Sequence, residues 1–162
     1  ACTEVASQAE QLALASLSPG TNLEASYLMG ILAGDFATPL PSVESEKAIE
    51  ANYRKASAIR LLGFLKAKEA IPVLISNIDF WDEKYKVYPV SLALGNIGEA
   101  AIPSLMGLLR REEIGRNIRA EMAVRALIMI KGEEEYAEFV SAQRSQLPPD
   151  VWRMLSIFAI SD

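Results

Sequence analysis

The sequence predicts an all-α fold for this chain of 162 residues. In segment after segment, apolar residues recur at the i, i+3, i+4, i+7 spacing that lines up side chains on one face of a helix. Proline and glycine interrupt these apolar stripes at regular intervals, and no segment shows the alternation typical of a half-buried β-strand. Together these observations predict a series of helices joined by short turns.

The N-terminal part of the chain is predicted to form two helices. They cover about 4–17 and 22–34, and Pro19-Gly20 separates them as a turn. A proline-containing loop follows and leads to Ser42, a residue type that caps helix N-termini. We expect this region, 1–42, to be an irregular helical pair that caps the rest of the chain.

Four longer helices are predicted downstream, over about 43–66, 85–97, 116–131 and 149–160. The first is long enough that we expect a break near Asn52. Shorter apolar stripes lie between these segments, and each short helix is expected to end at a turn rich in charged residues or glycine.

Two short stripes begin with the same pair of residues. Pro72 and Pro103 each follow an isoleucine and lie near a predicted helix start, where the missing N–H of proline is tolerated. The segments 63–72 and 95–103 also resemble one another, with their prolines 31 and their glycines 32 residues apart. A period slightly above thirty residues indicates stacked helical hairpins, each of which needs its neighbour to bury its apolar stripe.

The segment Ala93–Leu105, ALGNIGEAAIPSL, closely resembles the short HEAT-like repeats, including the bilin-lyase-associated type. Their usual form is A-L-G-x-I-G followed by A-I-P-x-L-x-x-L-L. Leu108-Leu109 completes this pattern, and Ile71–Leu74 repeats its second half. In the third copy, Ile128 and Lys131 replace two glycines.

The resemblance is specific over about 54–131, looser over 133–160 and weak before residue 43. It implies an α-solenoid of about four HEAT-like pairs, with 43–162 as one continuous array. It also implies that the second helix of each pair lines a concave face.

Composition excludes several kinds of chemistry. The chain has no histidine and one cysteine, so Ser/His/Asp and Cys/His catalytic arrangements, CxxC redox pairs and Cys/His zinc sites are ruled out. Sixteen Lys and Arg against 21 Asp and Glu give a net charge of −5, which argues against a general nucleic-acid binder. We therefore expect no catalysis, no cofactor and no bound metal.

The sequence was also searched for membrane-spanning and export signals. No run of 18 apolar residues and no signal peptide are visible, so we expect no transmembrane segment and favour the cytoplasm. The sequence begins at Ala1, however, and an exported mature chain with a lipid-bearing Cys2 stays open as an alternative.

Four cations recur near the starts of the predicted second helices. Lys55, Lys86, Arg119 and Arg153 lie 31, 33 and 34 residues apart. One interpretation is a cationic track for an acidic peptide or a phosphate backbone. The alternative, which we favour, is an internal ladder in which these cations pair with acids from neighbouring turns, namely Asp79, Asp82, Glu113 and Asp150.

Four aromatic residues gather beside one predicted turn: Phe80, Trp81, Tyr85 and Tyr88. Aromatics exposed within a charged rim are typical of binding hot spots. We favour the alternative that they pack against the core between repeats. Stacking of nucleic-acid bases on these rings is a third interpretation, which the net negative charge disfavours.

Carboxylates are also clustered, but at positions that favour helix capping. Glu133–Glu135 fall in the first turn of a predicted helix, where the helix dipole favours negative charge. Glu112-Glu113 and the acids of 44–50 are interpreted in the same way. The glycines form no phosphate-binding loop after a strand.

The sequence therefore predicts a non-catalytic module that binds a protein or peptide. The alternative is an accessory or lyase-like factor that acts on a chromophore-bearing partner, as resemblance to the bilin-lyase type implies. Nucleic-acid binding, as in HEAT-like DNA glycosylases, is a third class. The terminal helix, with an apolar face over Val151–Ile160, is also a candidate for pairing with a second copy.

Overall fold

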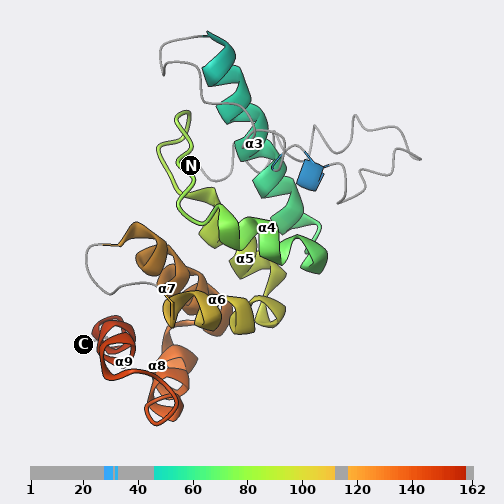
Figure 1. Ribbon diagram of the computed structural model, residues 1–162. Helices are drawn as coiled ribbons and strands as arrows, with labels where there is room; N and C mark the ends of the chain where they lie inside the picture. The colour runs from blue at the N-terminus through green and yellow to red at the C-terminus, as the bar shows by residue number, and fades with distance from the viewer. Residues whose placement is uncertain (1–27, 31, 33–45, 112–116, 160–162) are drawn as a thin grey trace.

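The computed structural model describes residues 28–30, 32, 46–111 and 117–159 (Figure 1). These residues form helices and connecting turns, and none of them lies in a β-strand. The predicted all-α fold is thus confirmed for this part of the chain. The predicted helix at 4–17, the cap at Ser42 and most of 22–34 fall outside the described residues, although 28–30 and 32 are helical.

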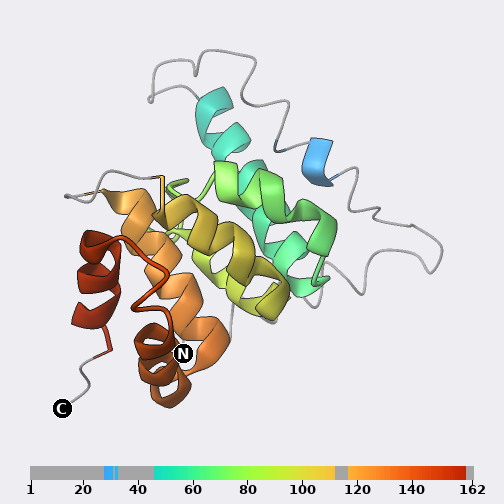
Figure 2. The same cartoon turned by 60° about the horizontal axis from the view of Figure 1, so that its bottom comes forward.

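Nine helical segments follow one another from residue 46 onward within the described ranges. In chain order they are α3 (Glu46–Phe64), the 3-10 helix η1 (Lys68–Ala70), α4 (Ile71–Ser76), α5 (Pro89–Ile97), the 3-10 helix η2 (Glu99–Ala101), α6 (Ile102–Leu109), α7 (Ile118–Lys131), α8 (Glu133–Ala142) and α9 (Pro149–Ile157). The helices progress through the molecule from α3 at one end to α8 and α9 at the other (Figures 1 and 2).

Packing runs along two series of helices. α3 packs against α5, and α5 packs against α7. The shorter α4 packs against α5 and α6, and α6 in turn packs against α7. One cluster of buried apolar side chains extends through these contacts from Leu28 to Leu155, so every element shares a continuous core.

Close approach between α3 and α5 depends on Gly63. A Cβ atom at this position would lie 2.5 Å from Cα of Ala93, which is well inside van der Waals contact. The absence of a side chain at Gly63 therefore lets the two helix backbones touch. Prolines begin α4, α5, α6 and α9, as expected at a position where no N–H is needed.

Two of the predicted boundaries are wrong. α3 continues through Asn52 without a break, because the Asn52 amide bonds to a distant loop instead of competing for its own helix backbone. The helix predicted from residue 85 begins at Pro89, because residues 82–87 form a tight turn closed by an isolated bridge between Asp82 and Val87.

The acids of 133–135 do lie in the first turn of α8, as predicted. The open face predicted for the last helix is smaller than expected. Val151 and Leu155 are buried within the chain, and the exposed apolar residues at this end are Ile157 and Phe158. Ile160, the end of the predicted face, lies outside the described residues.

Candidate functional site

The aromatic segment forms the loop between α4 and α5, and Asp82 determines its shape. The backbone N–H of Asp82 donates to the Val87 carbonyl at 2.9 Å, and the Lys86 N–H donates back to the Asp82 carbonyl at 2.8 Å. The Asp82 carboxylate accepts hydrogen bonds from the N–H groups of Lys84, at 2.9 Å, and Tyr85, at 3.3 Å. Lys86 takes a left-handed φ of 55° to close this turn.

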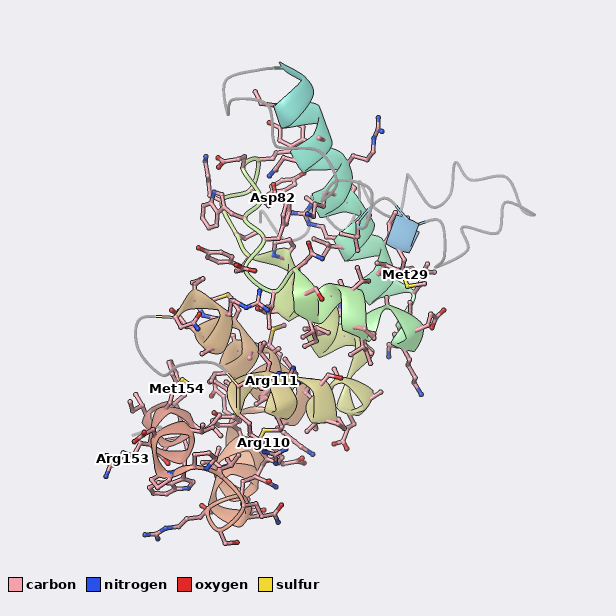
Figure 3. The ribbon with its side chains drawn as sticks, in the orientation of Figure 1. Met29, Asp82, Arg110, Arg111, Arg153 and Met154 are labelled. Carbon is pink, nitrogen blue, oxygen red and sulfur yellow. The ribbon has the colours of Figure 1, made fainter. Side chains whose placement is uncertain are left out.

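Helix α3 holds the loop in place through two side chains. Arg60 forms an ion pair with the Asp82 carboxylate, whose side chain is 0% exposed. The Asn52 amide donates to the Trp81 carbonyl at 2.9 Å, and its oxygen accepts from the Glu83 N–H at 3.1 Å. Figure 3 shows Asp82 in the loop beside α3. Because every polar group of Asp82 is used, the loop has a fixed conformation.

The four predicted aromatic residues have different surroundings. Phe80 and Tyr88 are partly buried against the core, and the Lys55 ammonium lies 5.1 Å from the Phe80 ring centroid. Trp81 contacts Tyr88 edge to face, with centroids 4.9 Å apart. Tyr85 is exposed, with Arg60 4.7 Å from its ring centroid. Phe80 and Tyr88 thus pack against the core, whereas Tyr85 is exposed to solvent.

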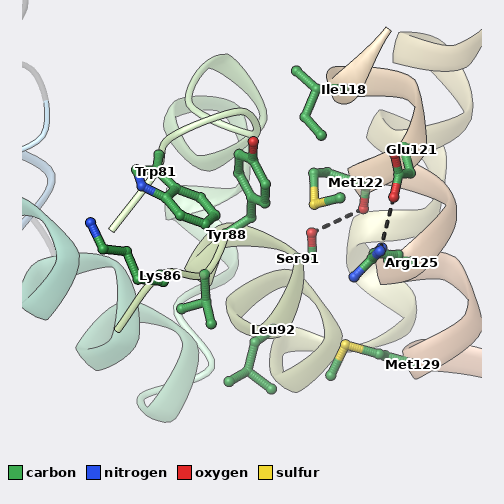
Figure 4. A pocket seen from close by; sticks show the side chains of 11 residues that line it. Trp81, Lys86, Tyr88, Ser91, Leu92, Ile118, Glu121, Met122, Arg125 and Met129 are labelled. Atoms are coloured by element: carbon green, nitrogen blue, oxygen red, sulfur yellow. Dashed lines mark hydrogen bonds and ion pairs between the residues drawn. The ribbon is translucent and has the colours of Figure 1, made fainter. Parts of the chain in front are cut away.

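A groove of about 360 Å³ opens beside this loop, between α5 and α7 (Figure 4). Most of its lining is apolar or aromatic, and Leu92 of α5 and Met129 of α7 are 47% and 48% exposed. The lining residues are Trp81, Lys86, Val87, Tyr88, Ser91, Leu92, Ile118, Glu121, Met122, Arg125 and Met129. The groove therefore combines an apolar floor with a few charged groups.

The Ser91 hydroxyl and the charged groups of the groove are paired within the chain. The buried Ser91 hydroxyl donates to the Met122 carbonyl at 3.1 Å and so links α5 to α7. Arg125 pairs with Glu121 at 2.9 Å, and Lys86 pairs with Glu83 at 2.5 Å, both at exposed positions. Ser91 is structural, whereas the two ion pairs face solvent.

The structure does not place the four predicted cations in one equivalent set. Lys55 is buried against Phe80, Lys86 belongs to the loop instead of a helix, and Arg153 is exposed on α9. Figure 3 shows Arg153 at the opposite end of the molecule from the loop. Of the four, Lys86 lines the groove.

Arg119 makes the kind of contact that the ladder interpretation predicts. It pairs with Asp79 at 2.8 Å, and its guanidinium donates to the carbonyls of Ile75, at 3.3 Å, and Ser76, at 3.4 Å. The N-terminus of α7 is thereby tied to the C-terminal carbonyls of α4. Arg153 instead lies 3.9 Å from Asp150 of its own helix. The predicted partner Glu113 lies outside the described residues.

Sequence reasoning did not single out Arg60, Leu92 or Met129. The available signal for Arg60 was that it is the one charged residue in the otherwise apolar segment 58–65. Leu92 and Met129 are apolar residues that fall off the stripes of their own helices, and such residues are expected to be exposed.

Within the described ranges, no group of three or more Cys, Asp or Glu residues is placed to hold a metal ion. Among the same residues, no single helix is long and apolar enough to cross a membrane. α5 together with η2 and α6 reaches that length and composition only as a pair bent by 112°.

The chain was also compared with known proteins. No protein-family model matches it, and no curated protein and no solved structure gives a significant match.

Proposed function

We propose that this chain is a non-catalytic protein-interaction module, in which stacked HEAT-like hairpins of an α-solenoid present a groove to a segment of a partner protein. The observation that carries the proposal is the apolar groove between α5 and α7, walled by a loop that Asp82 fixes in place.

The stacked arrangement is supported by features that recur along the chain. α3, α5 and α7 are each followed by a residue with positive φ, namely Lys66 at 51°, Gly98 at 84° and Gly132 at 75°. These residues lie 32 and 34 residues apart. After the first two, a 3-10 turn and an Ile-Pro pair open the next helix. Such regularity is what a repeat array requires.

Binding is supported by the chemistry of the groove. Leu92 and Met129 leave about half of their surface in water, next to the aromatic pair Trp81 and Tyr88. Covering contiguous apolar surface of this kind is favourable, and aromatic and methionine side chains are enriched where proteins meet. The groove volume of about 360 Å³ suits a few side chains of a bound segment.

Fixed walls reduce the cost of binding. The loop is held by Asn52 and by the buried Arg60–Asp82 pair, so its ordering is complete before a partner arrives. A preorganised surface loses less conformational entropy on association than a mobile one.

A pull-down from the native host tests the proposal with a matched pair of variants. Leu92→Asp places a charge on the groove floor, whereas Ile157→Asp makes the same change on α9, at a residue that is 69% exposed and outside the groove. We expect a protein that binds the unmodified chain to be lost with Leu92→Asp and retained with Ile157→Asp. Equal retention by both variants would contradict the proposal. Circular dichroism on both variants checks that each is folded.

A further inference from the structure

Positively charged residues lie on both sides of the apolar floor of the groove. Lys86 lies on the loop side and Arg125 on the α7 side, with Trp81, Tyr88, Leu92 and Met129 between them (Figure 4). The acids that accompany them are Glu83 and Glu121. Among the residues that line the groove itself, two cations, Lys86 and Arg125, thus accompany one acid, Glu121, in a chain of net charge −5.

Both rim cations are held weakly. The Lys86 side chain is 66% exposed and that of Arg125 is 60% exposed, and each pairs with an acid at 43% exposure. Ion pairs in water contribute little, because solvent screens them and ordering two long side chains costs entropy. A carboxylate of a partner can therefore replace Glu83 or Glu121 at small cost.

We infer that the occupant of the groove is an acidic peptide segment, with a bulky apolar side chain flanked on both sides by aspartate or glutamate. This inference rests on the proposed function. The apolar anchor lies on the exposed Leu92 and Met129, above the buried Met122, and the flexible thioether of Met129 adapts to its shape. The flanking carboxylates then meet Lys86 on one side and Arg125 on the other.

The same rim disfavours a phosphate backbone. Binding to a nucleic acid depends on many cations facing consecutive phosphates, whereas Glu83 and Glu121 lie beside the cations here. A single anchor with one or two carboxylates matches the number of lining cations better than a polyanion does.

Selection from a random linear-peptide library displayed on phage tests the inference on the full chain. Clones are counter-selected against the Leu92→Asp variant, so that those retained depend on the groove. We expect the retained peptides to share an apolar anchor with acidic flanks. Basic or uncharged flanks would overturn the inference and leave the proposed function standing. If no clone depends on Leu92, both fail.

The double variant Lys86→Gln/Arg125→Gln then measures the contribution of the rim. Removing each cation is expected to raise the dissociation constant of a retained synthetic peptide roughly two- to five-fold. The affinity of the double variant should also depend less on salt concentration. Arg153→Gln removes a cation of α9 whose side chain is 75% exposed, more than either rim cation, and is expected to leave the affinity unchanged. Unchanged affinity in the double variant would contradict the acidic occupant. Tighter binding of a labelled oligothymidine than of the peptide would replace it with a nucleic acid.

Discussion

Asp82 connects three parts of the site, although it is a single buried carboxylate. It receives two backbone N–H groups of its own loop and the guanidinium of Arg60 from α3. Its own backbone N–H and carbonyl close the turn with Val87 and Lys86. A buried charge is stable only when it is paired and hydrogen-bonded in this way. The position of the groove wall therefore depends on this one residue.

Replacing Asp82 with asparagine should be strongly destabilising. Asp82→Asn keeps the shape of the side chain but leaves the largely buried Arg60 without its counter-charge, and removing one partner of such a pair costs about 3 kcal/mol. Urea unfolding measures this change. The control Glu83→Gln breaks an exposed pair one residue away and should cost less than about 1 kcal/mol. Equal effects in the two variants would show that Asp82 does not hold the loop.

Tyr136 gives the folded state a dependence on high pH. Its hydroxyl donates to the Leu155 carbonyl at 3.1 Å, and burial raises the pKa of the phenol above its ordinary value. The folded state therefore binds this proton more tightly than the unfolded state does. The resulting stabilisation is complete below about pH 10, the pKa of an exposed tyrosine, and is lost as the pH rises above it.

Tyr136→Phe isolates this contribution. At neutral pH the variant should lose about 1 kcal/mol with its hydrogen bond to Leu155. Above about pH 10 the free energy of unfolding should fall more steeply for the unmodified chain than for the variant. Chemical unfolding at several pH values measures both slopes. Parallel slopes would mean that the phenol of Tyr136 ionises equally well in the folded state.

At the scale of elements, the structure depends on how closely neighbouring helices approach. The α3–α5 contact relies on Gly63, and the α5–α7 contact includes the buried hydrogen bond from Ser91 to Met122. Arg119 adds a polar link from α7 to the end of α4. Each link joins residues that are 30 or more positions apart in sequence, so the packing of one pair of helices positions the next.

Two glycine-to-alanine substitutions distinguish the effect of close helix packing on stability from the effect of helix propensity. Gly63→Ala places a Cβ 2.5 Å from the Ala93 backbone, and such overpacking should destabilise the chain by about 1–3 kcal/mol. Gly107 lies inside α6 with no atom nearer than 3.9 Å to an added Cβ, so Gly107→Ala should stabilise by roughly 0.5–1 kcal/mol. Thermal unfolding compares them. A stabilising Gly63→Ala would contradict the close α3–α5 contact.

Local patterns in the sequence predicted the elements better than the contacts between them. Apolar spacing identified α5 and α7, and the Ile-Pro pairs marked the starts of α4 and α6. The start of α5 was misplaced because the turn depends on Asp82, whose buried partner Arg60 lies 22 residues away. Asn52 was misread for the same reason, since its hydrogen-bond partners are 29 and 31 residues distant. Nothing local in the sequence specifies such pairs.

The same distinction applies to the site. The aromatic loop was predicted from composition, and Trp81, Tyr88 and Lys86 do line the groove. The opposite wall comes from α7, and the sequence gives no register between α5 and α7 that would bring Met129 close to Gly95. The even row of four cations was inferred from spacing alone, and their surroundings differ because each lies at a different depth in the packing.

At the scale of the whole molecule, the described helices share one core and expose an apolar groove along α5 and α7. The shared core holds the helices together, and the loop closes one side of the groove. A partner segment that binds there would contact the floor of the groove without rearranging the helices. Binding and stability should then be separable by substitution.

The five methionines allow this central claim to be tested directly. The chain, labelled with ¹³C at its methionine methyl groups, is titrated with a partner recovered in the pull-down or with a peptide retained in the selection. Met129 is exposed in the groove and the buried Met122 lies beneath its lining, whereas Met106 is buried in the core outside the groove and Met154 lies on α9. The account predicts that the signals of Met122 and Met129 shift while those of Met106 and Met154 stay in place. A shift confined to Met154, or shifts at none of the groove methionines, would contradict it.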